Sequence, residues 1–282
     1  MADRVAFVLG GGGLRGAVQI GMLRALLERG ITPDLIVGTS IGAINGAIVA
    51  QTPTVDALDD LLTAWISPEA ASVYGDSFVT QFSRLIRTRT HLNSPAPLRR
   101  LFEQILGADT RFEDLAVPLL VVAASIEQAA ERIFDSGLLV PAVLASSSVP
   151  GLLPPTRIGD ETFIDGGIVN SIPISPALAA GATVVYVLQV GRVEQPLAPP
   201  RTAIQTAQVA FEVARRHRFA HDVASIPAGV SLHVLPSGGA LEGDASLLSY
   251  RRADTVRTRI DLAYQASVDY LDGLSQTRDV RA

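Results

Sequence analysis

Residues 35–50 read LIVGTSIGAINGAIVA. The run Leu35–Val37 is apolar and of strand type, whereas Ala43–Ala50 has the spacing of a helix. Between them, Gly38-Thr39-Ser40-Ile41-Gly42 fits the Gly-x-Ser-x-Gly pattern, a strand-to-helix turn tight enough to need glycine beside the serine. Such a serine projects its hydroxyl at a helix start, where backbone N–H groups point toward negative charge. The stretch therefore predicts Ser40 as a nucleophile, with a simple N-capping serine as the alternative.

A second glycine-rich turn, Gly10-Gly11-Gly12-Gly13-Leu14-Arg15-Gly16, comes earlier in the chain. It joins a strand expected at Val5–Leu9 to a helix expected from about Leu14 to Arg29. Each turn ends a strand and opens a helix. One turn could therefore supply a nucleophile, and the other the N–H groups that stabilise its oxyanion.

The glycine loop also resembles a dinucleotide-binding pattern, as Gly11-x-Gly13-x-x-Gly16 after a strand. A dinucleotide site needs an acidic residue at the end of the second strand to hold the ribose. That strand ends here at Ser40 without a carboxylate. We therefore interpret the amides of Gly11, Gly12 and Gly13 as donors to an oxyanion. Arg15 would orient the loop or meet an anionic headgroup.

The rest of the chain alternates between strand-like and helix-like patterns. Strands are expected at residues 117–124, 131–134, 162–164, 183–189 and 231–235, and helices at 54–66, 97–106, 138–146, 203–221 and 245–271. This alternation predicts a mostly parallel sheet covered on both faces, in one α/β domain over residues 1–282. In such sheets functional groups gather beyond the carboxyl ends of the strands. Gly10, Ser40 and Asp165 each follow such an end, so we expect them to meet at one edge.

Composition excludes several kinds of chemistry. Cysteine is absent, which removes disulfides, thiolate catalysis and cysteine-ligated metal. All 23 basic residues are arginine, so a lysine Schiff base and a Walker-type phosphate loop are also excluded. The net charge of −5 argues against nonspecific nucleic-acid binding. The sequence offers no convincing metal cluster, and we expect no metal and no cofactor.

The location is expected to be cytoplasmic, with possible peripheral contact at a membrane. The chain begins Met1-Ala2-Asp3-Arg4 and leads directly into the glycine loop, without the charged and apolar regions of a signal peptide. No apolar run approaches the roughly 18 residues needed to cross a bilayer.

A nucleophilic serine needs a base, and Asp165 is the better candidate. It ends an apolar strand, and Gly166-Gly167 after it let the backbone turn sharply. The alternative is an aspartate that only caps a turn. The order Ser40, Asp165, His233 formally fits an α/β-hydrolase triad, but that fold builds several strands before its serine, and here only one precedes the serine's own. His217 and His221 lie in an arginine-rich stretch and suggest surface residues.

Together these residues resemble the patatin-like phospholipase family, of its bacterial type. The matching blocks are Gly11–Gly16, Gly38–Gly42, Ala145-Ser146-Ser147-Ser148-Val149-Pro150 and Asp165-Gly166-Gly167. The resemblance implies a three-layer α/β/α sandwich and a lipid acyl hydrolase with a Ser–Asp dyad and no catalytic histidine. By that match Ser40 is the nucleophile, Asp165 is the base, and the amides of residues 11–13 form the oxyanion hole.

Two alternatives to a lipid acyl hydrolase stay open. One is a soluble carboxylesterase or thioesterase with the same dyad, and the other is a non-catalytic lipid-binding module. The segment Phe78–Arg89 has an apolar face with arginines outside it, which suggests an interfacial helix that docks on lipid. Packing of that face on the domain core is the competing interpretation. The substrate is expected to be a lipid or ester, with transient membrane contact and no nucleic-acid partner.

Overall fold

The computed structural model describes residues 3–66, 92–191, 196–239 and 253–279. These residues form one eight-stranded sheet in the order β5-β6-β3-β2-β1-β7-β8, with β4 also paired to β3. The strands are β1 (Val5–Leu9), β2 (Leu35–Thr39), β3 (Leu119–Ser125), β4 (Ala130–Phe134), β5 (Thr156–Ile158), β6 (Glu161–Asp165), β7 (Val184–Leu188) and β8 (Ser231–Val234). Strands β3, β2, β1, β7 and β8 are mutually parallel, whereas β4 and β6 run antiparallel to β3.

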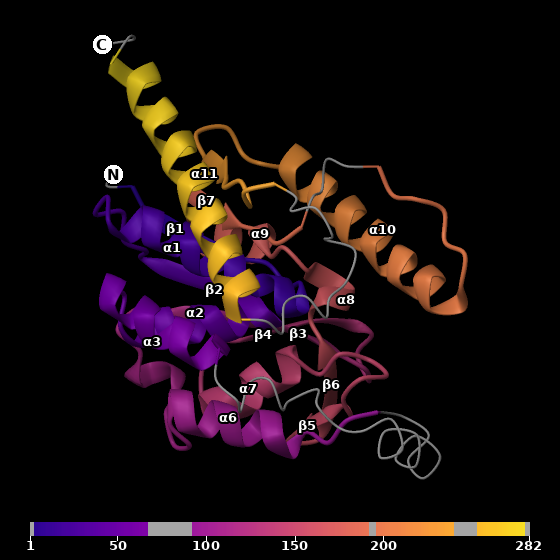
Figure 1. The fold of residues 1–282 in the computed structure, drawn as a ribbon. Coiled ribbons are helices and arrows are strands. Elements are labelled where there is room, and N and C mark those ends of the chain that lie inside the picture. The colour runs from indigo at the N-terminus through magenta and orange to yellow at the C-terminus, as the bar shows by residue number, and fades with distance from the viewer. Residues whose placement is uncertain (1–2, 67–91, 192–195, 240–252, 280–282) are drawn as a thin grey trace.

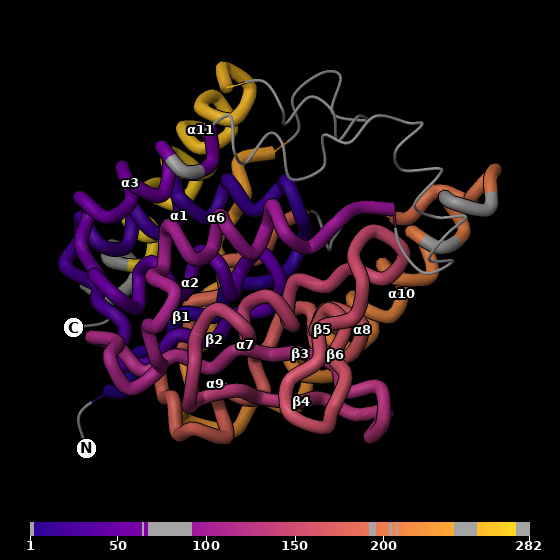
Figure 2. Tube along the Cα trace, turned by 90° about the horizontal axis from the view of Figure 1, so that it is seen from below, coloured from indigo at the N-terminus to yellow at the C-terminus, as the bar shows by residue number. Residues whose placement is uncertain are grey.

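Helices cover both faces of this sheet, which confirms the expected three-layer α/β/α sandwich with a mostly parallel sheet (Figures 1 and 2). The helices are α1 (Val18–Leu27), α2 (Ile41–Gln51), α3 (Val55–Ile66), α6 (Ala96–Leu106), α7 (Leu139–Ser146), α8 (Gly167–Asn170), α9 (Ile174–Ala179), α10 (Ala203–Ala224) and α11 (Ala253–Asp279), with 3-10 turns η1 (Gly13–Ala17) and η2 (Phe112–Asp114). Every helix in the described part of the chain is too short or too polar to cross a membrane.

Two hydrophobic clusters lie on opposite faces of the sheet. The larger one joins alternate sheet residues such as Phe7 and Ile36 to α1, α2, α3, α6, α7 and α11. The smaller one joins the intervening residues, such as Val8 and Val37, to α9 and to Phe219 of α10. Because β1 and β2 are buried on both faces, their sequences are continuous apolar runs and not alternating patterns.

Most expected elements are confirmed, but the short helices α8 and α9 were not expected, and two further differences lie near the site. The helix expected from Leu14 begins instead at Val18, after the 3-10 turn η1. Gly13 has φ = +58°, and this left-handed residue starts the turn where an α-helical hydrogen-bond pattern is not yet formed. Strand β5 was not expected; it forms a hairpin with β6 around Gly159 and Asp160, where Gly159 supplies the positive φ. The segment Phe78–Arg89 lies outside the described residues.

Asp165 meets Ser40 at the carboxyl end of β2, as expected, but its strand β6 does not run parallel to the strands that carry the other site residues. Since β6 is antiparallel to β3, its carboxyl end points into the sheet from the carboxyl edge of the parallel strands. Asp165 pairs with Ala123, and the preceding β3 residue, Val122, pairs with Thr39. The stagger of β6 therefore brings Asp165 to the level of Ser40.

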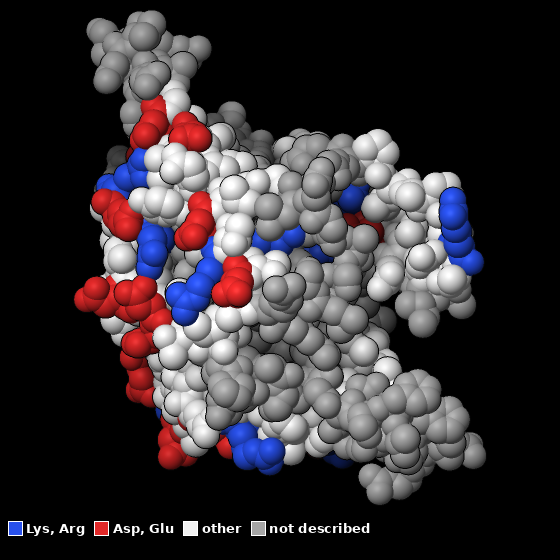
Figure 3. Space-filling model, in the orientation of Figure 1, with Lys and Arg blue, Asp and Glu red and all other residues white. Residues whose placement is uncertain are grey.

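Charged side chains are unevenly distributed on the face seen in Figure 3. Acidic groups gather along its left edge, in the area of α1, α3 and α11. Ion pairs there join neighbouring helices, such as Arg24 of α1 with Asp59 of α3 at 2.6 Å. An exposed pair of this kind contributes little to stability, typically about 0.2–1 kcal/mol.

Candidate active site

Ser40 occupies a strained turn between β2 and α2. Its backbone has φ = 56° and ψ = −123°, a left-handed conformation that costs a non-glycine residue on the order of 1–3 kcal/mol. The flanking glycines are required sterically. A Cβ at Gly38 would lie 2.5 Å from the Gly42 carbonyl oxygen, and a Cβ at Gly42 would lie 2.1 Å from that of Leu9. The turn thus has the geometry of a nucleophile elbow.

The structure brings Ser40 and Asp165 into direct contact. Ser40 Oγ donates a hydrogen bond to Asp165 Oδ2 at 2.6 Å, across 125 positions of sequence. The other carboxylate oxygen, Oδ1, accepts a hydrogen bond from the Gly167 amide at 2.7 Å. Both residues are buried, with Ser40 7% and Asp165 4% exposed. The carboxylate is therefore held in one orientation, with one oxygen on the hydroxyl.

The same environment perturbs the acid–base properties of Asp165. Burial raises the pKa of its carboxyl from 3.8 to about 6, while hydrogen bonds from Ser40 and Gly167 oppose that rise. At neutral pH the group is mostly ionised, yet it binds a proton far more readily than an exposed aspartate. These are the properties of a general base for chemistry near pH 7.

A hydrogen-bonded chain fixes the backbone of Ser40. The Ser40 amide donates to Ser146 Oγ at 2.8 Å, and Ser146 Oγ donates to the Val122 carbonyl at 2.6 Å. Ser146 is fully buried at the end of α7. Ser146 was expected only as a member of the matching block Ala145–Pro150, without a role of its own. The hydroxyl of a buried serine at a helix end can bond to many different groups. The sequence therefore carried no signal that Ser146 would accept from the Ser40 amide.

The glycine loop lies against the elbow. A Cβ at Gly16 would lie 2.4 Å from the Ile41 side chain, so only glycine lets the loop pack there. The Gly11 amide donates to the Ser171 carbonyl at 2.8 Å, so in this arrangement it is already engaged within the fold. Gly12 and Gly13 are exposed, and among the described residues their amides have no acceptor. Of the three amides expected to stabilise an oxyanion, these two remain available.

Arg15 is exposed at the edge of this loop and forms no ion pair with a carboxylate in the described ranges. Gly166 also permits close packing, because a Cβ there would lie 2.2 Å from the Val122 carbonyl oxygen. The Asp165-Gly166-Gly167 segment can therefore pass directly over β3.

No histidine of the described residues contacts Ser40 or Asp165. His233 lies on β8, three strands from β2, roughly 14 Å away at about 4.8 Å for each strand. Its ring stacks on Tyr186 at the level of Phe7, inside the sheet. His217 and His221 are on α10, and His91 lies outside the described residues.

The chain belongs to the patatin-like phospholipase family, whose sequence model matches residues 7–178. Patatin-like phospholipase domain-containing protein 7 of Rattus norvegicus is 34% identical over 191 residues, which cover 67% of this chain and 14% of that protein. Lysophospholipase NTE1 of Mycosarcoma maydis is 30% identical over 200 residues, 67% of this chain and 10% of that protein. The chain therefore spans 14% or less of the length of these two relatives.

Both relatives are eukaryotic, so the expectation of a bacterial type is not supported. Among solved structures, VipD from Legionella pneumophila has the same fold, with a TM-score of 0.53 at 16% sequence identity. The superposition covers 96% of this chain and 67% of VipD. It therefore extends past residue 178, where the family model ends, through much of the remaining chain.

Proposed function

We propose that this protein is a lipid acyl hydrolase that works through a serine acyl-enzyme, with Ser40 as nucleophile and Asp165 as base. The observation that carries the proposal is the 2.6 Å hydrogen bond from Ser40 Oγ to Asp165 Oδ2 at a strained elbow. Membership of the patatin-like phospholipase family supports the same assignment.

The reaction has two halves. Ser40 Oγ attacks the ester carbonyl carbon while its proton passes to Asp165 Oδ2. The tetrahedral intermediate collapses, and the leaving alcohol takes that proton, which leaves an acyl group on Ser40. Water then attacks the acyl carbon and gives a proton to Asp165. Ser40 departs, recovers the proton, and the fatty acid is released.

The negative charge on the tetrahedral oxygen would be stabilised by the glycine loop and by α2. We assign the donor role to the amides of Gly12 and Gly13, since the Gly11 amide bonds to Ser171. Ser40 is the N-cap of α2, so the positive end of an 11-residue helix dipole also faces the reacting carbon. Each preorganised donor of this kind is typically worth about 3–4 kcal/mol of barrier.

A lipid ester is the favoured substrate class. The family is named for phospholipases, and one relative is named a lysophospholipase. The exposed Arg15 beside the loop suits an anionic headgroup, and contact with a membrane would then be peripheral. A short-chain carboxylesterase or thioesterase would use the same dyad, and a chain-length series of nitrophenyl esters alongside phospholipid vesicles separates these substrates.

The test is covalent labelling by a fluorophosphonate together with ester hydrolysis. We expect the label on Ser40, and no label in Ser40→Ala. The matched control is Ser147→Ala, which removes another buried hydroxyl, one that bonds within α7 to the Val143 carbonyl. Full labelling of Ser40→Ala with its fold intact would assign the nucleophile to another residue. An unlabelled parent protein would point to a non-catalytic lipid-binding module.

A further inference from the structure

The two segments that carry the dyad are not neighbours in the sheet. Ser40 follows β2 and Asp165 ends β6, and β3 lies between these two strands. Besides the dyad bond itself, a direct link joins them next to the site. Thr39 Oγ1 donates to the main-chain carbonyl of Asn170 at 2.8 Å. Asn170 ends α8, the short helix that starts right after Asp165 and Gly166.

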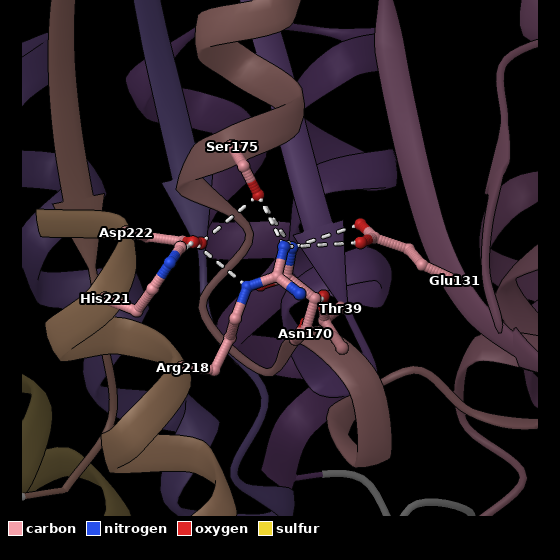
Figure 4. Close-up of polar contacts among 7 residues, drawn as sticks. All are labelled: Thr39, Glu131, Asn170, Ser175, Arg218, His221 and Asp222. Carbon is pink, nitrogen blue, oxygen red and sulfur yellow. Dashed lines mark hydrogen bonds and ion pairs between the residues drawn. The ribbon is translucent and has the colours of Figure 1, made fainter. Parts of the chain in front are cut away.

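Asn170 is itself held by its side chain. It is fully buried, and its Nδ2 donates to Glu131 Oε1 at 3.1 Å and to Ser175 Oγ at 3.2 Å. Glu131 comes from β4 and Ser175 from α9, so two further elements set the position of α8. Figure 4 shows these side chains converging on one point.

Arg218 of α10 binds both of those partners. Its Nη2 donates to Ser175 Oγ at 2.8 Å and lies 3.5 Å from Glu131 Oε2. Its Nε donates to Asp222 Oδ1 at 3.0 Å, and Ser175 Oγ also donates to Asp222 Oδ2 at 3.2 Å (Figure 4). The guanidinium thus touches every side chain that orients Asn170, and a carboxylate one turn further along α10 fixes its own direction.

Arg218 neutralises the negative charges of this cluster. It faces two carboxylates, Glu131 and the 5%-exposed Asp222, with His221 Nδ1 3.6 Å from the latter. Without the guanidinium, two negative groups would face each other across Ser175, and one of them is buried. Asn170 would then lose the fixed acceptors that hold its amide.

Helix α10 also contacts the rest of the site. A Cβ on Gly167 would lie 2.9 Å from the Phe211 ring, so Phe211 packs on the segment after Asp165. The buried Arg215 donates to the Val190 carbonyl at 3.2 Å, and the Val190 side chain packs against Gly12 of the glycine loop. Yet α10 lies beyond the residues that the family model matches.

We propose that Arg218 is a positioning residue for the dyad, acting through Ser175, Glu131 and Asn170 to hold α8 against Thr39. The proposal rests on the proposed function, because it concerns the geometry between Ser40 and Asp165. A misplacement of reacting groups by about 1 Å can cost on the order of 100-fold in rate. Loss of Arg218 therefore lowers the rate of the chemical step, while the residues that bind the substrate stay in place.

The experiment compares Arg218→Ala with Arg29→Ala on a soluble nitrophenyl ester. Arg29 forms an equally direct ion pair with Asp272 at 2.6 Å, but it follows the end of α1, and its other side-chain hydrogen bond within the described residues goes to the Ala25 carbonyl. We expect kcat of Arg218→Ala to fall at least about tenfold with KM within about twofold. Arg29→Ala should keep both constants, whatever its thermal midpoint does.

Chemical rescue separates the guanidinium's role from general damage. Arg218 lines an open cavity of about 650 Å³, together with His217 and Leu178, so a small cation can reach the vacated position. Millimolar guanidinium should restore kcat of Arg218→Ala, and urea or sodium chloride should not. Equal recovery of kcat with urea would contradict the proposal that the positive charge of Arg218 is required.

Ser175→Ala keeps the test decisive if Arg218→Ala does not fold. It deletes the hydroxyl that joins Asn170, Arg218 and Asp222, without removing a charge, and kcat should fall severalfold. Unchanged kcat in either folded variant, or an equal fall in Arg29→Ala, would overturn the positioning role. If Ser40 remains essential in that case, the positioning proposal alone fails; if Ser40→Ala stays active, both proposals fail.

Discussion

Ser40 and Asp165 meet in one hydrogen bond, but the chain places them by different means. The conformation of Ser40 belongs to the five-residue turn Gly38–Gly42 at the start of α2, and the bond from its amide to Ser146 is the distant contribution. The position of Asp165 depends on segments far away in the sequence. Its own amide donates to the Ser148 carbonyl, and its strand is antiparallel to β3.

The two residues also differ in what they cost the fold. Ser40 carries backbone strain, whereas the cost at Asp165 is the burial of a charge. Strain at the elbow is relieved only by changing the local turn. The cost at Asp165 can be removed by one isosteric substitution, and this difference allows the two contributions to be tested separately.

Asp165→Asn should have the largest effect on activity. The variant keeps the shape of the side chain but lacks a base, so we expect kcat/KM for ester hydrolysis to fall about a thousandfold or more. Asp34→Asn is the matched control, since Asp34 accepts a hydrogen bond from the Val5 amide at the other end of β1. A folded Asp165→Asn with substantial activity would contradict the assignment of the base.

The same variant should be more stable than the parent protein at alkaline pH. A carboxyl whose pKa is raised in the folded state stabilises the fold below its unfolded pKa, and that contribution is lost as pH rises through the folded pKa. A rise from 3.8 to about 6 corresponds to about 3 kcal/mol. Denaturant unfolding should therefore favour Asp165→Asn by up to that amount at pH 8, with the difference closing toward pH 4.

Gly42→Ala tests the local side of the comparison. The new Cβ would lie 2.1 Å from the Leu9 carbonyl oxygen, so α2 must move away from β1 and the glycine loop. We expect a loss of about 3 kcal/mol in unfolding free energy and about a hundredfold in kcat/KM. Gly273→Ala in α11 is the control, because a Cβ there meets nothing within 4 Å, and it should be neutral or slightly stabilising. Equal behaviour of the two variants would contradict the steric role of Gly42.

Ser146→Ala should have a smaller effect. It removes the acceptor of the Ser40 amide but leaves the elbow glycines and Asp165 in place. We expect about a tenfold loss of kcat, which corresponds to about 1.4 kcal/mol, with fluorophosphonate still reacting at Ser40. The control is Ser148→Ala, a neighbouring buried serine whose hydroxyl bonds to the Leu144 carbonyl and to Thr156. A larger loss in the control would mean that packing of α7, and not the Ser40 amide, governs the rate.

The elbow and the parallel strands could be predicted because their causes are local. Apolar runs buried on both faces mark β1 and β2, and the glycines around Ser40 form a pattern within five residues, although Gly42 is required by the Leu9 carbonyl of β1. Asp165 was also identified as the candidate base, from its place at the end of a strand and before two glycines, but the direction of that strand was not expected. The sequence does not encode that β6 runs antiparallel, since that direction follows from its pairing with β3 and β5.

Contacts between distant segments were the ones that sequence patterns missed. The bonds from the Ser40 amide to Ser146 and from Arg218 to Ser175 join elements more than forty positions apart. Such pairs leave no periodic signal, because either partner could equally face solvent. The interfacial role suggested for Phe78–Arg89 stays a prediction.

The position of the acidic limb alone does not identify the base. With the pKa of Asp165 raised to about 6, the rate should fall below about pH 6, where a histidine base would also titrate. An exposed aspartate base would show its limb at lower pH, but burial moves the pKa of Asp165 into the range of histidine. A variant without histidine removes this ambiguity.

The central claim is that Asp165 is the base that accepts the Ser40 proton and that no histidine takes part. Its most direct test is the pH dependence of kcat/KM in a variant with His91, His217, His221 and His233 all replaced by glutamine, after circular dichroism has verified its fold. The account predicts activity within about threefold of the parent protein, and an acidic limb that remains near pH 6. Loss of activity by about a thousandfold in the folded variant, or disappearance of the limb near pH 6, would contradict it.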